Sequence, residues 1–241
     1  MRVDYDAVLV EHAVFEAGRR DPELEAEIHQ ATDPLYEIDD LRKRDAHFAV
    51  VCKTFFQRLE LDHPLAQLLA EHPLIERAVH RCVVRKAPRS RQEMAELYIK
   101  HDLDTGTWMR TIIIQVCPHS LLNPEKLGVK MRRELMQIAD MLDERFGYRR
   151  DSLAGRLPRE NLIRDRYRVL WDIYAQGRLA RSGHGNETVM AALAVQLRHV
   201  FAGPWADRAS VALNGITLIT GVVAFFLIPL SRRDSGKAPD G

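Results

Sequence analysis

Residues 107–116 read TWMRTIIIQV, and the segment 123–142 that follows shortly afterwards reads NPEKLGVKMRRELMQIADML. β-Branched residues fill the first segment, which favours an extended strand. The stretch MAELYIK at residues 94–100 is also strand-like, and a glycine-containing turn segment separates it from the first. The pattern predicts an antiparallel hairpin over residues 94–116, and no other stretch predicts a sheet.

The second segment carries the signals that begin a helix. Asn123 can cap it, Pro124 suits its first position, and Glu125 places an acid in its first turn. We expect this helix to run to about Glu144 and to end near Gly147. An apolar stripe along it predicts a buried face, made of Leu127, Met131, Leu135, Ile138 and Leu142.

The window Arg133-Glu134-Leu135-Met136-Gln137 in this helix resembles the His-Glu-x-x-His helix of the zincin metallopeptidases. The resemblance covers about 40 residues, because it includes the order of an apolar strand, a loop ending in Asn-Pro and the helix. In zincins, two histidines four positions apart hold Zn²⁺ while the glutamate activates its water. The resemblance implies a zincin-like core with Glu134 at the position of the general base.

Both histidine positions differ in this chain, where Arg133 and Gln137 occupy them. A guanidinium has no lone pair to offer a metal, and an amide oxygen is a poor zinc ligand beside imidazole. The resemblance therefore implies a degenerate site with no bound metal and no cofactor. Glu134 is its one candidate catalytic residue.

Two other interpretations of this helix stay open. Its polar row is also typical of the solvated side of an ordinary amphipathic helix. A metal site built from other ligands beside Glu134 is the second, and Asp165 or Asp172 in a later helix would be the ligand to test. The polar row consists of Arg133, Gln137, Asp140 and Glu144.

Composition limits the class of protein. With 241 residues, of which 46% are hydrophobic, the chain can bury a sizeable core. Its 35 basic and 34 acidic residues leave a net charge of +1, so we expect no nucleic-acid partner. One local basic cluster can hold phosphate, but solvated surface is the favoured interpretation because Glu93 and Glu96 follow it. The cluster consists of Arg81, Arg85, Lys86, Arg89 and Arg91.

Three widely spaced cysteines, Cys52, Cys82 and Cys117, fit neither a disulfide framework nor a Cys-x-x-Cys metal site. They indicate a reducing compartment. Cys117 precedes Pro118-His119 without a cysteine-protease signature, and we expect it to end the buried strand. The N-terminus is charged early and lacks the apolar run of a secretory signal.

The fold class predicted is α+β, mainly α-helical with a small antiparallel β-hairpin. Further helices are expected within residues 7–30, 34–60, 74–82, 159–177 and 187–202, with a loop over 178–185. The expected domains are an N-terminal helical region at 1–93, a zincin-like hairpin-plus-helix core at 94–182 and an amphipathic connecting helix at 186–208.

Residues 209–230 contain no charged side chain and are long enough to cross a bilayer as one C-terminal transmembrane helix. Trp205 and Arg208 precede this stretch, and Arg232-Arg233 opens a polar tail at 231–241. Small or polar residues recur along one face of the predicted helix, which suits close packing on another helix. They are Ser210, Asn214, Thr217, Gly221 and Ala224.

The sequence thus predicts a tail-anchored, single-pass membrane protein whose N-terminal domain is cytoplasmic. Its expected role is that of a non-catalytic accessory or scaffold subunit, a pseudoenzyme with a degenerate zincin-like core. Its expected partners are the lipid bilayer and another transmembrane helix, from a second copy or from a membrane-complex subunit. The alternatives are a membrane-bound metal-dependent hydrolase that uses Glu134, and a tail-anchored helical adaptor without peptidase ancestry.

Overall fold

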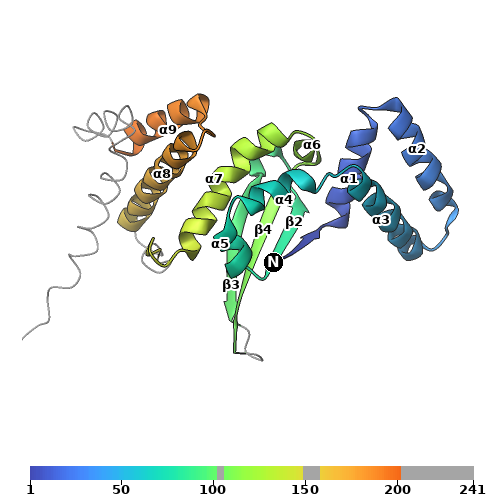
Figure 1. The fold of residues 1–241 in the computed structure, drawn as a ribbon, viewed down its shortest axis with the longest axis horizontal. Helices are drawn as coiled ribbons and strands as arrows, with labels where there is room; N and C mark the ends of the chain where they lie inside the picture. The colour runs from blue at the N-terminus through green and yellow to red at the C-terminus, as the bar shows by residue number, and fades with distance from the viewer. Residues whose placement is uncertain (102–105, 149–157, 202–241) are drawn as a thin grey trace, which may run out of the picture. The chain divides into compact units, whose positions relative to one another are not determined.

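The computed structural model describes residues 1–101, 106–148 and 158–201 (Figure 1). The chain divides into two compact units, Met1–Gly147 and Tyr148–Gly241. Unit 1 is mainly helical with a small mixed sheet, and the described part of unit 2 is a pair of helices. The coarse expectation of a mainly helical α+β fold is therefore confirmed.

The sheet of unit 1 has four strands in the order β1-β2-β4-β3. Strands β3 (Met94–His101) and β4 (Trp108–Val116) pair antiparallel, with Leu97 opposite Ile112, which confirms the predicted hairpin. Strands β1 (Arg2–Tyr5) and β2 (Arg81–Lys86) add parallel pairs, β1 to β2 and β2 to β4. The expectation that the hairpin is the whole sheet was therefore wrong.

The missed strand β2 lies where the sequence predicted the end of a helix. Helix α5 (Pro73–Ala78) stops before β2 begins, so the helix expected over 74–82 is shorter than predicted. Parallel pairing with β1 explains the difference. The Arg2 amide donates to the His80 carbonyl at 3.1 Å, although the two residues are far apart in the sequence. No local pattern records a partner so distant in sequence.

One face of the sheet carries the core of unit 1. Helices α4 (His63–Ala70), α5 and α7 (Pro124–Leu142) lie over it (Figure 1). Side chains that alternate along the strands point into this layer and are fully buried, namely Cys82, Val84, Ile112 and Ile114. On the opposite face the neighbours of these residues in β2, Arg81 and Arg85, are exposed.

The N-terminal helices break at the positions that the sequence indicates. Helix α1 (Ala7–Gly18) is followed by α2 (Pro22–Thr32), a 3-10 turn η1 (Asp33–Glu37) and α3 (Leu41–Arg58). The Asp21 carboxylate caps α2 by accepting from the Glu23 amide at 3.0 Å. At Gly18, an added Cβ would lie 3.0 Å from Ile28 Cδ1, so glycine permits the close approach of α1 and α2.

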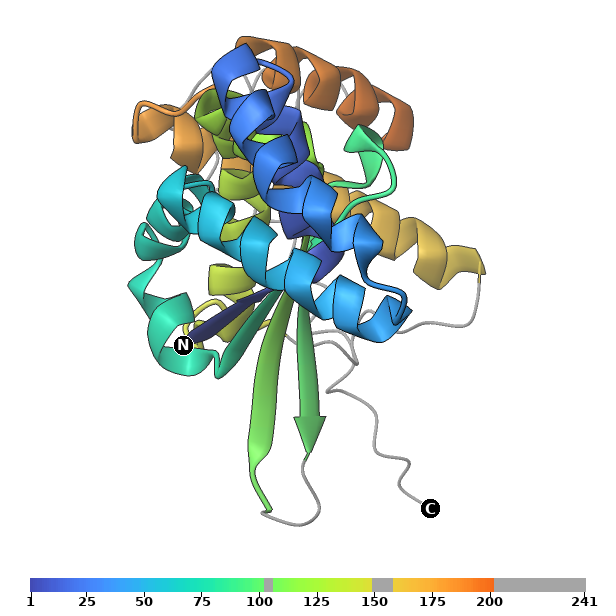
Figure 2. The same ribbon diagram turned by 90° about the vertical axis from the view of Figure 1, so that its right-hand side faces the viewer.

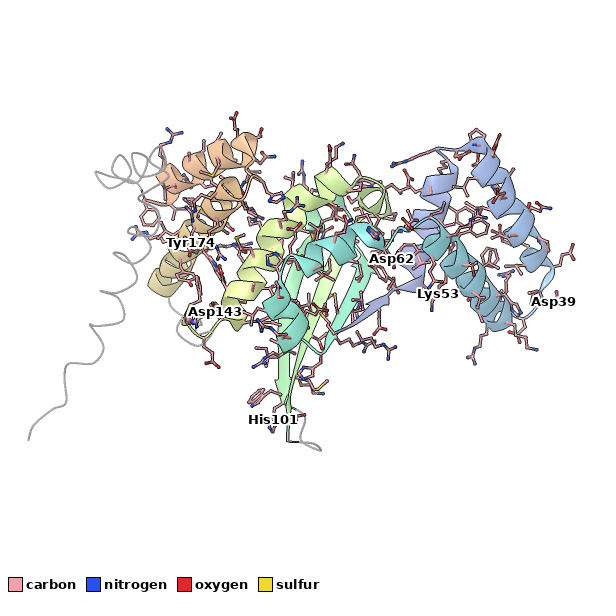
Figure 3. The ribbon with its side chains drawn as sticks, in the orientation of Figure 1. Asp39, Lys53, Asp62, His101, Asp143 and Tyr174 are labelled. Carbon is pink, nitrogen blue, oxygen red and sulfur yellow. The ribbon has the colours of Figure 1, made fainter. Side chains whose placement is uncertain are left out.

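The hairpin extends past the rest of unit 1 at its loop end (Figure 2). His101 lies there (Figure 3), and its ring packs edge-on against Trp108 with centroids 4.8 Å apart. Ile99, Trp108 and Met109 are exposed on this projecting part. Cross-strand side-chain pairs of this kind stabilise a hairpin.

Helix α7 begins and ends close to the predicted positions. The Asn123 side chain accepts from the Lys126 amide at 3.1 Å, which confirms the expected cap. The helix ends at Leu142, and Asp143 follows it as C-cap (Figure 3). A short helix α6 (Pro118–Leu121) joins β4 to it, and a 3-10 turn η2 (Ser90–Gln92) precedes β3.

In unit 2, α8 (Pro158–Arg181) and α9 (Glu187–Val200) pack through Val169, Ile173, Leu193 and Leu197. The loop expected from residue 178 begins later, because α8 continues to Arg181. Across the described ranges, no helix is long and apolar enough to cross a bilayer. Residues 209–230, with Ser210, Asn214, Thr217, Gly221 and Ala224, lie outside those ranges.

Candidate functional site

The zincin-like window is only partly accessible, because Leu135 and Met136 within it are buried. Leu127, Met131 and Leu135 are fully buried against the core, as predicted. Arg133 and Gln137 are half-buried and one helical turn apart, with Glu134 between them in sequence. One helix therefore presents all three side chains of the predicted degenerate site.

Glu134 is engaged by a cation of the same helix. The Arg133 guanidinium donates from Nη2 to Glu134 Oε1 at 2.8 Å, and the two side chains are 32% and 19% exposed. A general base needs a water or substrate proton within hydrogen-bond reach. Here one carboxylate oxygen already accepts from a guanidinium, whose charge is permanent.

The donors around Glu134 do not form a usual metal-ligand set. Arginine has no lone pair for a metal, and the amide oxygen of glutamine is a weak substitute for imidazole. Groups of three or more His, Cys, Asp or Glu side chains able to hold a metal are absent from the part of the chain that the structure describes. Asp165 is exposed and Asp172 half-buried, both on α8 of unit 2.

Exposure to solvent varies along the polar row of α7. Asp140 is only 5% exposed, and Arg133 and Gln137 are half-buried. Glu144 is exposed. Charged side chains are seldom buried unless they are paired, so this side of α7 is a structured polar surface.

A second polar cluster on the same helix was missing from the sequence analysis. The Glu93 side chain is completely buried, and its carboxylate accepts from the Cys117 amide at 2.8 Å and from Ser120 Oγ at 2.5 Å. The Lys130 ammonium donates to the same carboxylate. We call this set of Glu93, Cys117, Ser120 and Lys130 the Glu93 cluster.

The electrostatic balance at Glu93 favours its charged form. Burial acts to raise the pKa of this carboxyl, but the hydrogen bonds from Lys130, Ser120 and the Cys117 amide outweigh it and the pKa is lowered. Lys130 also donates to the Ser90 carbonyl at 3.2 Å. The cluster therefore joins two parts of unit 1. One is the connection between β4 and α7, and the other is the segment that precedes β3.

Cys117 ends the buried strand as expected, 5% exposed directly after β4. Burial raises the pKa of its thiol, and the thiol lies 3.8 Å from the Ala87 carbonyl and 3.9 Å from Ser90 Oγ. Cys52 and Cys82 are also free and buried, with pKa values raised by burial to about 11 and about 12. Thiols held protonated in this way are poor nucleophiles at neutral pH.

Comparison with known proteins adds no assignment: the chain matches no family model, no curated protein and no solved structure.

Proposed function

We propose that this protein is a non-catalytic accessory or scaffold subunit with a degenerate zincin-like core, anchored in a membrane by residues 209–230. The observation that carries the proposal is the 2.8 Å contact between the Arg133 guanidinium and the Glu134 carboxylate. The carboxylate of Glu134 accepts from a fixed cation of its own helix. Such a pair stabilises surface structure and activates no nucleophile.

The succession of elements supports the same proposal. Strand β4, the short helix α6 and the capped helix α7 supply the strand, loop and helix order on which the resemblance rests. Helix α7 packs against β3 and against α4, which fix the helix that carries Arg133 and Glu134.

Metal analysis of the purified full-length chain in detergent tests the non-catalytic role. We expect less than stoichiometric zinc, unchanged by Glu134→Gln. The matched control is Glu125→Gln, which removes an exposed acid from the first turn of the same helix. Stoichiometric zinc that is lost in Glu134→Gln or Asp172→Asn, but kept in Glu125→Gln, would establish the metal-dependent hydrolase instead.

Co-purification from solubilised membranes tests the anchor and its helical partner. Gly221→Leu places a large side chain on the small-residue face, and we expect it to abolish association. Val222→Leu is the matched control, because it enlarges the neighbouring residue off that face. Association unchanged by Gly221→Leu would remove the helical partner from the proposal, and full solubility without detergent would remove the anchor.

A further inference from the structure

Unit 1 contains a cavity of about 490 Å³ at the carboxyl ends of the parallel strands β2 and β4. Its walls come from α1, from the loop after β2 and from the residues after β4. Helix α1 packs against α6 beside this end of the sheet (Figure 1). Crevices at the carboxyl ends of parallel strands are common ligand sites, and this volume suits a small organic molecule.

The cavity holds a lysine without a carboxylate partner. Lys86, the last residue of β2, is half-buried and donates to His12 Nδ1 at 2.9 Å. Within the described ranges, no carboxylate lies at ion-pair distance from its ammonium group. An imidazole accepts the hydrogen bond but does not balance the charge. Glu11 and Glu16 also line the cavity, but neither pairs with Lys86, so its ammonium group can pair with an anionic ligand.

A second cation lies at the rim. Arg89 is exposed in the loop after β2, and its guanidinium makes no hydrogen bond or ion pair with the described residues. Arg19 also lines the cavity, but Glu16 is shared between it, at 3.2 Å, and Arg20, at 3.5 Å. Lys86 and Arg89 are therefore the cations available to a ligand.

A hydroxyl group and an imidazole ring are held beside these cations. Ser90 Oγ lies 3.3 Å from His119 Nε2, and both residues line the cavity. The Ser90 carbonyl accepts from Lys130, which the buried Glu93 carboxylate holds in place. The Glu93 cluster therefore fixes the backbone that presents the hydroxyl, and Phe15 adds an aromatic wall from α1.

We propose that this cavity binds the phosphoryl group of a small phosphorylated molecule. Lysine and arginine together with a hydroxyl and imidazoles supply charge and several hydrogen bonds to a tetrahedral dianion. The Phe15 side of the cavity receives the organic part. The inference rests on unit 1 alone and is independent of the function proposed for α7.

Calorimetric titration of the full-length chain with phenyl phosphate at low ionic strength tests the site. We expect saturable binding at one site, weakened about tenfold or more in Lys86→Gln, since a charge-assisted hydrogen bond is lost. Arg85→Gln is the matched control, because it removes the same charge from the adjacent residue on the other face of the sheet. Its affinity is expected to stay within about twofold of the original protein.

Inorganic phosphate and benzoate complete the test. If inorganic phosphate binds as tightly as phenyl phosphate, the ligand of the site is the free phosphate ion. If phenyl phosphate binds more tightly, the ligand is an organic phosphate. Benzoate binding equal to that of phenyl phosphate would overturn the phosphoryl assignment. Absence of saturable binding at millimolar ligand, or equal losses in Arg85→Gln and Lys86→Gln, would overturn the site.

Arg89→Gln keeps the test decisive if Lys86→Gln alters the far-ultraviolet circular dichroism spectrum. The Arg89 side chain is exposed and makes no hydrogen bond or ion pair with the described residues. Its carbonyl accepts from the Gln92 amide at 2.8 Å, which Arg89→Gln keeps, so the replacement leaves folding intact. A severalfold loss of phenyl phosphate affinity is expected. An unchanged affinity would exclude Arg89 and with it the two-cation site.

Discussion

Helix α7 contributes to three ion pairs, with Glu71, Glu93 and Glu134, and the last two differ in their surroundings. Lys130 pairs with Glu93, which lies 37 residues away in the sequence and whose side chain is completely buried. Arg133 pairs with its neighbour Glu134, and both side chains are partly exposed. One pair ties three segments of unit 1 together, whereas the other joins two adjacent residues of one helix.

This difference in burial predicts that Glu93 and Glu134 contribute unequally to the stability of the fold. A buried carboxylate is tolerated because every oxygen finds donors, and the loss of its partners would leave an uncompensated charge. A partly exposed pair gains little, because water solvates each member nearly as well. Glu93 is therefore a structural residue, whereas the pair of Glu134 with Arg133 is expected to contribute little to stability.

Replacement of Glu93 is expected to have the largest effect on stability. Glu93→Ala leaves Lys130, the Cys117 amide and Ser120 without their shared acceptor, and should cost about 3 kcal/mol of unfolding free energy. Breaking a buried ion pair usually costs about 3–5 kcal/mol, and the lower end applies here because the Lys130 side chain is 40% exposed. Urea unfolding of the full-length chain measures it, with Glu125→Ala as control. A loss below about 1 kcal/mol would place the pair in the same class as Arg133–Glu134.

The lowered pKa of Glu93 predicts a specific acid sensitivity. A carboxyl whose pKa is lower in the folded than in the unfolded chain contributes stability that is complete above its ordinary value of about 4.5. That contribution falls as the pH drops through the lowered folded value. Urea unfolding between pH 6 and pH 3 should therefore show a steeper loss in the original protein than in Glu93→Gln. Parallel pH profiles would contradict the assignment.

The sequence predicted local features of this molecule well and its long-range contacts poorly. The hairpin and the Asn123 cap depend on neighbouring residues, and both are present. The pairing of β1 with β2 and the Glu93 cluster join residues that are far apart in the chain, and no periodicity marks them. Lys86 was grouped with Arg81 and Arg85 as surface charge, although strand alternation places it on the opposite face of β2.

Loss of the helix cap should have an intermediate effect, because it concerns the start of the helix that carries both pairs. Asn123→Ala leaves the Lys126 amide without its acceptor and is expected to cost about 1 kcal/mol. Asn123→Asp retains an acceptor and should restore most of that loss. Urea unfolding compares the three proteins. Equal stability of the alanine and aspartate variants would show that the cap does not hold α7 in place.

The smallest effect on stability is expected at Glu134, the candidate catalytic residue of the zincin-like window. Glu134→Gln removes the charge but keeps the shape and an oxygen acceptor for Arg133, so it should change the unfolding free energy by less than about 1 kcal/mol. Combining it with Glu93→Gln should give additive losses, because the two acids have separate partners. The double-mutant cycle in urea measures this. A coupling above about 1 kcal/mol would mean that the two polar sides of α7 act as one network, and that Glu134 is held by more than its neighbour.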